Sequence, residues 1–192
     1  MAVTRVAYAV DGWGEGELWF DGPILVWHEL PHPRATTGLP RATTGLGSSP
    51  HPGGASTRRP LGATLPRKSG RVSAMTAPIA SRVVHKVERY FDGEQVDFAD
   101  VAVALDDMTP FQAAVATALR RVRYGDVVSY GELAKAAGYP NAQRAAGTFC
   151  AHNRFPLILP CHRVVGATGL GSYGSVGTEY KRRLLELEGV SL

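Results

Sequence analysis

The sequence has no run of apolar residues approaching the length of about 18 that a membrane-spanning helix needs, so no membrane association is expected. Its N-terminus also lacks the basic and then apolar layout of a secretory signal. It has only two cysteines, Cys150 and Cys161. Two cysteines make no disulfide framework and, at this spacing, no Cys-x-x-Cys metal site. We therefore expect an intracellular, cytoplasmic protein with free thiols and no metal.

Acidic residues are missing from residues 31–77, which carry seven basic side chains. Proline and glycine supply 14 of these 47 residues, and a seven-residue repeat runs from Arg34 to Gly47. So little apolar surface cannot offset the entropy of ordering the chain, which predicts a disordered insertion. Its positive charge suits weak, nonspecific binding of DNA, and a solvated linker without a role is the alternative.

The remaining charge is unevenly distributed along the chain. Residues 1–30 and 78–108 together carry 4 basic and 12 acidic side chains, whereas residues 109–192 carry 10 basic and 5 acidic ones. A basic C-terminal part is the electrostatic pattern expected of a segment that contacts phosphates, although a surplus of this size is also common in other proteins.

Residues 1–30 and 78–108 are predicted to form one small α+β domain, interrupted by the insertion. Alternating apolar residues broken by glycines predict short antiparallel strands, the third over residues 24–30. Apolar residues at helical spacing predict a helix from Pro78 to about Phe91, and residues 101–105 suit a further strand.

Residues 109–192 are predicted to be mostly helical, with a winged helix-turn-helix-like arrangement. Thr109, Pro110 and Gln112 form a capping box that opens a helix running to about Arg123. Two short helices, 132–137 and 142–152, follow, the second with Asn141 as its expected cap, and a last helix spans 178–188. Small residues on the second short helix fit either close approach to a partner or tight internal packing.

The stretch from Asn153 to Val165 carries the strongest chemical signal. Its apolar residues 157–159, closed by Pro160, predict a buried strand that ends at Cys161. His162 and Arg163 follow directly, and a thiol beside an imidazole and a guanidinium is in a setting that lowers its pKa. The alternative is a buried structural cysteine.

The sequence Pro-Cys-His-Arg-Val at residues 160–164 resembles the active-site motif of the O6-alkylguanine-DNA alkyltransferases. Two further segments resemble the same family, Tyr-Gly-Glu-Leu-Ala at 130–134 and Arg-Ala-Ala-Gly at 144–147. The resemblance covers roughly residues 109–192. It implies a sheet-plus-helix N-terminal domain beside a catalytic, DNA-binding one.

The resemblance also implies roles for individual residues. Cys161 would be the nucleophile, His162 the base that acts through a water, Glu188 the partner of that histidine, and Asn153 a hinge. Arg144 would enter the base stack in place of an extruded nucleotide, with a surface ion pair as the alternative. The remaining DNA or base contacts fall on Tyr130, Gly131, Arg163, Tyr173 and Ser175. Arg154 replaces the family's usual proline, and the loop at 173–177 has an extra residue.

The implied activity is irreversible transfer of an alkyl group from O6-alkylguanine, or O4-alkylthymine, in a flipped-out base to Cys161 at the floor of a cleft. The partner would be damaged double-stranded DNA, bound by a monomer without a cofactor. Three alternatives stay open: a protein that binds alkylated bases without repairing them, a winged-helix regulator with a structural or redox-sensing cysteine, and a cysteine hydrolase.

Overall fold

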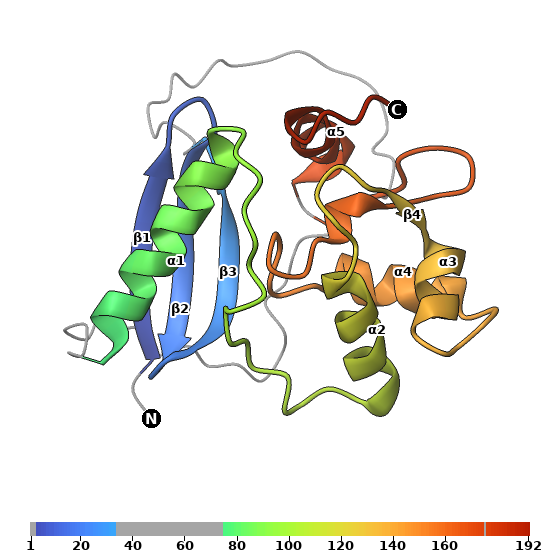
Figure 1. Cartoon of the computed structure of the whole chain (residues 1–192), viewed down its shortest axis with the longest axis horizontal. Helices are drawn as coiled ribbons and strands as arrows, with labels where there is room; N and C mark the ends of the chain where they lie inside the picture. Colours follow the sequence, from blue (N-terminus) through green and yellow to red (C-terminus); the bar gives the residue numbers. More distant parts are fainter. Residues whose placement is uncertain (1–2, 34–74, 175) are drawn as a thin grey trace, which may run out of the picture.

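The computed structural model describes residues 3–33, 75–174 and 176–192 (Figure 1). Its N-terminal part is an antiparallel sheet of order β1-β2-β3, made of β1 (Val3–Val10), β2 (Gly14–Asp21) and β3 (Ile24–His32). Helix α1 (Thr76–Phe91) packs on one face of the sheet. The predicted α+β class is therefore confirmed, with the third strand two residues longer than expected.

The sheet and α1 share an apolar core because both present apolar residues at the period of their own structure. Leu18, Phe20 and Leu25 of the sheet are fully buried, as are Val83 and Val87 one helical turn apart on α1. Gly93 follows the helix with a φ of 87°, a left-handed conformation that glycine adopts without a steric penalty.

The strand predicted at residues 101–105 is reduced to one bridge. Leu25 donates from its backbone to Ala102 and accepts from Ala104, which makes a single parallel bridge between Leu25 and Val103. The bridge continues the sheet beyond β3 for one residue only, and it ties the segment that leads to the C-terminal helices to the sheet.

The C-terminal part consists of helices around a short parallel pair of strands. These elements are α2 (Pro110–Arg120), β4 (Val128–Ser129), α3 (Tyr130–Ala136), α4 (Gln143–Ala151), β5 (Val164–Val165) and α5 (Gly177–Leu187). The capping box at Thr109 is present, and Ser129 and Glu132 make a second one that starts α3 at Tyr130. Helices α2, α3 and α4 pack against one another (Figure 1).

The expected cap of α4 is wrong. Asn141 has a φ of 69° in the turn before the helix, and the capping position is taken by Ala142, which makes no side-chain hydrogen bond. Asparagine tolerates the left-handed region better than most residues, so the turn after Pro140 uses it for backbone shape instead.

The buried strand predicted at residues 157–159 is also wrong. These residues are buried as expected, but they form a turn in which Leu157 has a φ of 69°. Leu159 donates to Phe155, and Cys161 donates to Leu159 across Pro160, whose φ of −78° and ψ of 64° make an inverse γ-turn. The backbone groups of this segment are thus hydrogen-bonded within the turn. A short apolar run does not by itself distinguish a buried turn from a buried strand.

The predicted disordered insertion, 31–77, lies outside the described residues except at its ends. There the prediction is wrong, because residues 31–32 belong to β3 and residues 76–77 to α1. None of the helices in the described ranges is both long and apolar enough to cross a membrane.

Candidate active site

Cys161 begins a short 3-10 helix, Cys161–Arg163, and its side chain is buried, with 4% of the residue exposed. The Asn153 amide donates to the Cys161 sulfur at 3.0 Å and to the Leu159 carbonyl at 2.7 Å. Its oxygen accepts from the Phe155 backbone at 3.0 Å. One side chain therefore spans the turn and fixes the sulfur at its end.

Burial raises the pKa of the Cys161 thiol, and four weaker effects oppose it. They are the Asn153 hydrogen bond, the positive charge of Lys181, the Tyr173 hydroxyl and the backbone N–H of Cys161 itself. The Tyr173 hydroxyl makes no hydrogen bond of ordinary geometry with the described residues, yet it lies near enough to the sulfur to favour the thiolate. The expectation that His162 and Arg163 lower this pKa is therefore wrong, because neither is among the groups acting on the thiol.

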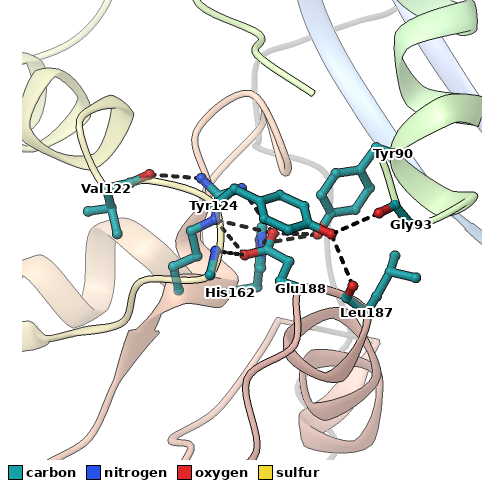
Figure 2. A network of polar contacts seen from close by, with 9 residues as sticks. Tyr90, Gly93, Val122, Tyr124, His162, Leu187 and Glu188 are labelled. Atoms are coloured by element: carbon teal, nitrogen blue, oxygen red, sulfur yellow. Dashed lines mark hydrogen bonds and ion pairs between the residues drawn. The ribbon is translucent and has the colours of Figure 1, made fainter. Parts of the chain in front are cut away.

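His162 and Glu188 form a buried pair (Figure 2). The His162 Nε2 lies 2.7 Å from a Glu188 oxygen, and both side chains are fully buried. A carboxylate accepts, so Nε2 carries the proton and Nδ1 is left as an acceptor. Nδ1 is buried without a hydrogen-bond partner among the described residues. Burial lowers the pKa of His162, and the hydrogen bond to Glu188 offsets this only in part. The ring is therefore neutral, and its Nδ1 is free to accept a proton.

Arg163 and Tyr90 complete this polar cluster. Arg163 donates to both Glu188 oxygens, at 2.9 Å each, and to the Val122 carbonyl at 2.8 Å, while the Tyr90 hydroxyl donates to Glu188 at 2.7 Å. Burial alone would raise the pKa of Glu188, but its bonds with His162 and Arg163 hold it at about 2. Arg163 is 7% exposed, which contradicts the prediction that it contacts DNA.

Lys181, which was not among the predicted site residues, is the cation near the thiol in the part of the chain that the structure describes. Its ammonium donates to the carbonyls of Val164 at 2.6 Å and Leu170 at 2.5 Å, and lies 5.8 Å from the Tyr130 ring centroid. Burial lowers its pKa, whereas the nearby Cys161 and Cys150 raise it. One signal was available: Lys181 shares the buried stripe of α5 with Leu184 and Leu185, where a lysine is unusual.

Replacing Lys181 by methionine is expected to raise the pKa of Cys161 further, since the nearby positive charge is lost while the side-chain volume is kept. The rate of Cys161 alkylation by iodoacetamide, followed against pH, should have its midpoint at higher pH than in the wild type. Lys135→Met, at an exposed lysine, is the matched control. An unchanged midpoint in the Lys181 variant would rule out this electrostatic role.

The structure has a cavity of about 450 Å³ at helices α3 and α4. Its lining residues come from α3, α4 and the segments beside them: Ser129, Tyr130, Gly131, Gln143, Arg144, Gly147 and Ala167. Cys161 is not among them, so the expectation of a sulfur at the cavity floor is not met. Tyr130 lies near both the cavity and the Cys161 sulfur. It lines the cavity, and its pKa, which burial raises to about 12, is also raised by the nearby Cys161.

The other predicted residues are divided between the cavity and the interior. Arg144 is exposed in the first turn of α4, and no ion pair holds it within the described ranges. Gly131 is at the cavity beside it. Tyr173 is buried and stacked on Tyr180, with ring centroids 6.4 Å apart. Ser175 lies outside the described residues.

The sequence matches a family model described as "6-O-methylguanine DNA methyltransferase, DNA binding domain" over residues 110–190. Among curated proteins named methylated-DNA–protein-cysteine methyltransferase, one from Methanopyrus kandleri is 48% identical over 104 residues, which are 54% of this chain and 76% of that protein. One from Metallosphaera sedula is 43% identical over 104 residues. The match covers 54% of this chain but 64% of that relative, less than two thirds of its length.

Solved structures resemble almost the whole chain. A single-residue variant of the O6-methylguanine methyltransferase from Mycobacterium tuberculosis is 30% identical, with a TM-score of 0.67 over 97% of this chain and 92% of that one. A second structure from the same organism, solved in complex with DNA, is 30% identical with a TM-score of 0.63, over 98% of this chain and 92% of that one.

Proposed function

Because the chain belongs to the 6-O-methylguanine DNA methyltransferase family, we propose that it repairs DNA by moving an alkyl group from O6-alkylguanine to Cys161. Two contacts carry this proposal: the hydrogen bond from Asn153 to the Cys161 sulfur, and the buried pair that the next residue, His162, makes with Glu188. Residues 109–192 would form the DNA-binding alkyltransferase unit, and the sheet and α1 its support, in a monomer acting on DNA in the cytoplasm.

The chemistry is an in-line displacement at the alkyl carbon. His162 Nδ1 accepts the thiol proton through a water molecule, and Glu188 stabilises the imidazolium that results. The sulfur–carbon bond forms as the bond from carbon to the guanine oxygen breaks. The guanine leaves with the bonding electron pair and takes a proton from the Tyr130 hydroxyl, which is still protonated at neutral pH. The His162 imidazolium then releases the thiol proton to solvent and Tyr130 regains one from it, so that the thiol proton is the one the guanine gains overall.

The product is a thioether on Cys161, which none of the surrounding side chains can cleave. Each molecule would therefore act once, as a stoichiometric reagent. This outcome also defines the direct test. The protein is incubated with a duplex containing O6-methylguanine and digested, and the Cys161 peptide is weighed. A gain of one methyl group supports the proposal. An unmodified peptide from a protein that still binds the duplex favours a binding protein or a regulator.

The substrate base is stacked in the duplex, so it must be flipped out, at a cost of a few kcal/mol. The cavity at α3 and α4 and the exposed Arg144 at its edge support a site for this step. Arg144 would take the space of the flipped nucleotide and repay part of the cost. Because Cys161 is buried and the Tyr173 hydroxyl lies near its sulfur, Tyr173 would have to move for the base to reach the sulfur.

Replacing Arg144 by alanine is expected to slow transfer from duplex DNA by roughly ten- to a hundred-fold, since a few kcal/mol of flipping cost is no longer offset. Transfer from the free base O6-benzylguanine should stay at the wild-type rate. Arg121→Ala, which removes an exposed charge away from the cavity, is the control. Equal losses on both substrates would argue against a role of Arg144 in base flipping.

A further inference from the structure

His28 of β3 joins the N-terminal sheet to the turn that precedes Cys161. It is 2% exposed and its backbone donates to the Arg154 carbonyl at 2.9 Å. Its ring Nδ1 lies 2.7 Å from the Pro156 carbonyl oxygen, and its Nε2 lies 2.7 Å from the Tyr8 hydroxyl. Two hydrogen bonds from one residue of the sheet thus bracket Phe155, which is fully buried.

The contacts of His28 fix its protonation. A carbonyl oxygen only accepts, so Nδ1 must carry a proton towards Pro156. Burial lowers the pKa of His28 to about 4, so near neutral pH the ring is neutral and its Nε2 accepts from the Tyr8 hydroxyl. The Tyr8 hydroxyl also lies 3.1 Å from the Glu29 carbonyl, so its one proton is shared between that oxygen and the closer His28 Nε2.

The turn held by His28 is also the one that holds the sulfur. Asn153 precedes Arg154, accepts from the Phe155 backbone and donates to the Cys161 sulfur. Leu157, directly after Pro156, has a left-handed φ of 69°, a conformation that is strained in a non-glycine residue and persists only where the surroundings enforce it. The Arg154 side chain adds bonds to Ala104 and Asp107.

We propose that His28 is a positioning residue for the alkyl transfer: its Nδ1 bond to Pro156 fixes the 153–161 turn so that Asn153 keeps its hydrogen bond to the Cys161 sulfur. The inference rests on the function proposed above. His28 would thus let the N-terminal sheet influence the reactivity of the sulfur indirectly, because the hydrogen bond to the sulfur itself comes from Asn153, outside the sheet.

Two matched variants separate the two ring contacts. In His28→Asn the amide nitrogen stands in for Nδ1, so the bond to Pro156 is kept. In His28→Gln the longer side chain reaches towards Tyr8, so the bond to Pro156 is lost. Both place an uncharged amide in the same buried site. The measurements are the single-turnover transfer rate at saturating duplex, the Kd for that duplex, and the pH profile of Cys161 alkylation by iodoacetamide.

We expect His28→Gln to transfer about ten-fold more slowly than the wild type, in the range found when groups that orient a reactive residue are lost. Its Kd should be unchanged and its alkylation midpoint should lie at higher pH, since the Asn153 bond favours the thiolate. His28→Asn should be close to wild type in all three. Equal behaviour of the two variants, or a slow His28→Asn with a fast His28→Gln, would overturn the inference.

A measurement on the wild type guards against variants that do not fold. The long-range proton–nitrogen NMR spectrum at neutral pH should show His28 protonated on Nδ1 alone, and protonation on Nε2 alone would refute the Pro156 bond. The alkylation profile also keeps this inference separate from the proposed function. If the wild type transfers no alkyl group, the function fails, while a midpoint shift in His28→Gln alone would still support positioning of the sulfur.

Discussion

Replacing Cys161 by alanine is expected to abolish alkyl transfer while leaving the affinity for duplex DNA unchanged. The sulfur is the only atom proposed to form a bond to the alkyl group, and removal of the nucleophile from a comparable catalytic cluster costs about 10⁶-fold in rate. DNA contacts are proposed at the cavity, which Cys161 does not line. A transfer assay with labelled O6-methylguanine duplex, run beside a mobility-shift titration, measures both.

Cys150→Ala is the matched control for this prediction. Cys150 is the second free cysteine, also buried, and burial raises its pKa so far that it remains a neutral thiol at any ordinary pH. We expect the Cys150 variant to accept one methyl group per molecule, as proposed for the wild type. Transfer that survives in Cys161→Ala and disappears in Cys150→Ala would show that the nucleophile is Cys150 instead.

Replacing Glu188 by glutamine is expected to lower the free energy of unfolding by about 3–5 kcal/mol at neutral pH, because it leaves the buried Arg163 charge without its partner. Glutamine keeps the size of the side chain and one acceptor oxygen, so the loss reports the charge together with the second acceptor, where the amide NH2 would face donors. Chemical denaturation of the two proteins measures the difference. Glu186→Gln, at an exposed carboxylate of the same helix without an ion pair in the described ranges, should change stability little.

The loss of unfolding free energy in Glu188→Gln should become smaller as the pH falls. The pKa of Glu188 is about 2 in the folded protein and near its ordinary value of 4.5 when unfolded. Its stabilising contribution, of the order of 3 kcal/mol, is therefore complete above about pH 4.5 and is lost as the pH falls through about 2. The stability difference between wild type and Glu188→Gln should shrink over this window. A difference that stays constant would contradict the ion-pair interpretation.

Several elements could be predicted from the sequence because their causes are local. The capping box at Thr109 and the apolar period of α1 depend on residues within a few positions of each other, and both are present. The Pro-Cys-His-Arg-Val stretch likewise identified the family, and the resemblance that pairs Glu188 with His162 agrees with the 2.7 Å contact between them.

Other features depend on partners far along the chain and could not be predicted from local patterns. The interpretation of residues 157–159 as a strand failed because hydrogen bonds within the turn, and Asn153 across it, replace a neighbouring strand. His28 shows the same limit: its partner Pro156 is 128 positions away, and nothing in the local sequence of β3 distinguishes it from a surface histidine.

The sequence by itself determined the family and which side chains are available for the proposed chemistry: a thiol, an imidazole and a carboxylate, and a helix that presents small residues beside an arginine. Only the tertiary structure decided which basic side chain lies near the thiol and which one pairs with the buried carboxylate. Arg163, two positions from the sulfur in the chain, turns to Glu188, and Lys181, far beyond it in the sequence, supplies the cation near the thiol instead. The physical reason is that electrostatic effects depend on distance and burial in space, and folding sets both without regard to order along the chain.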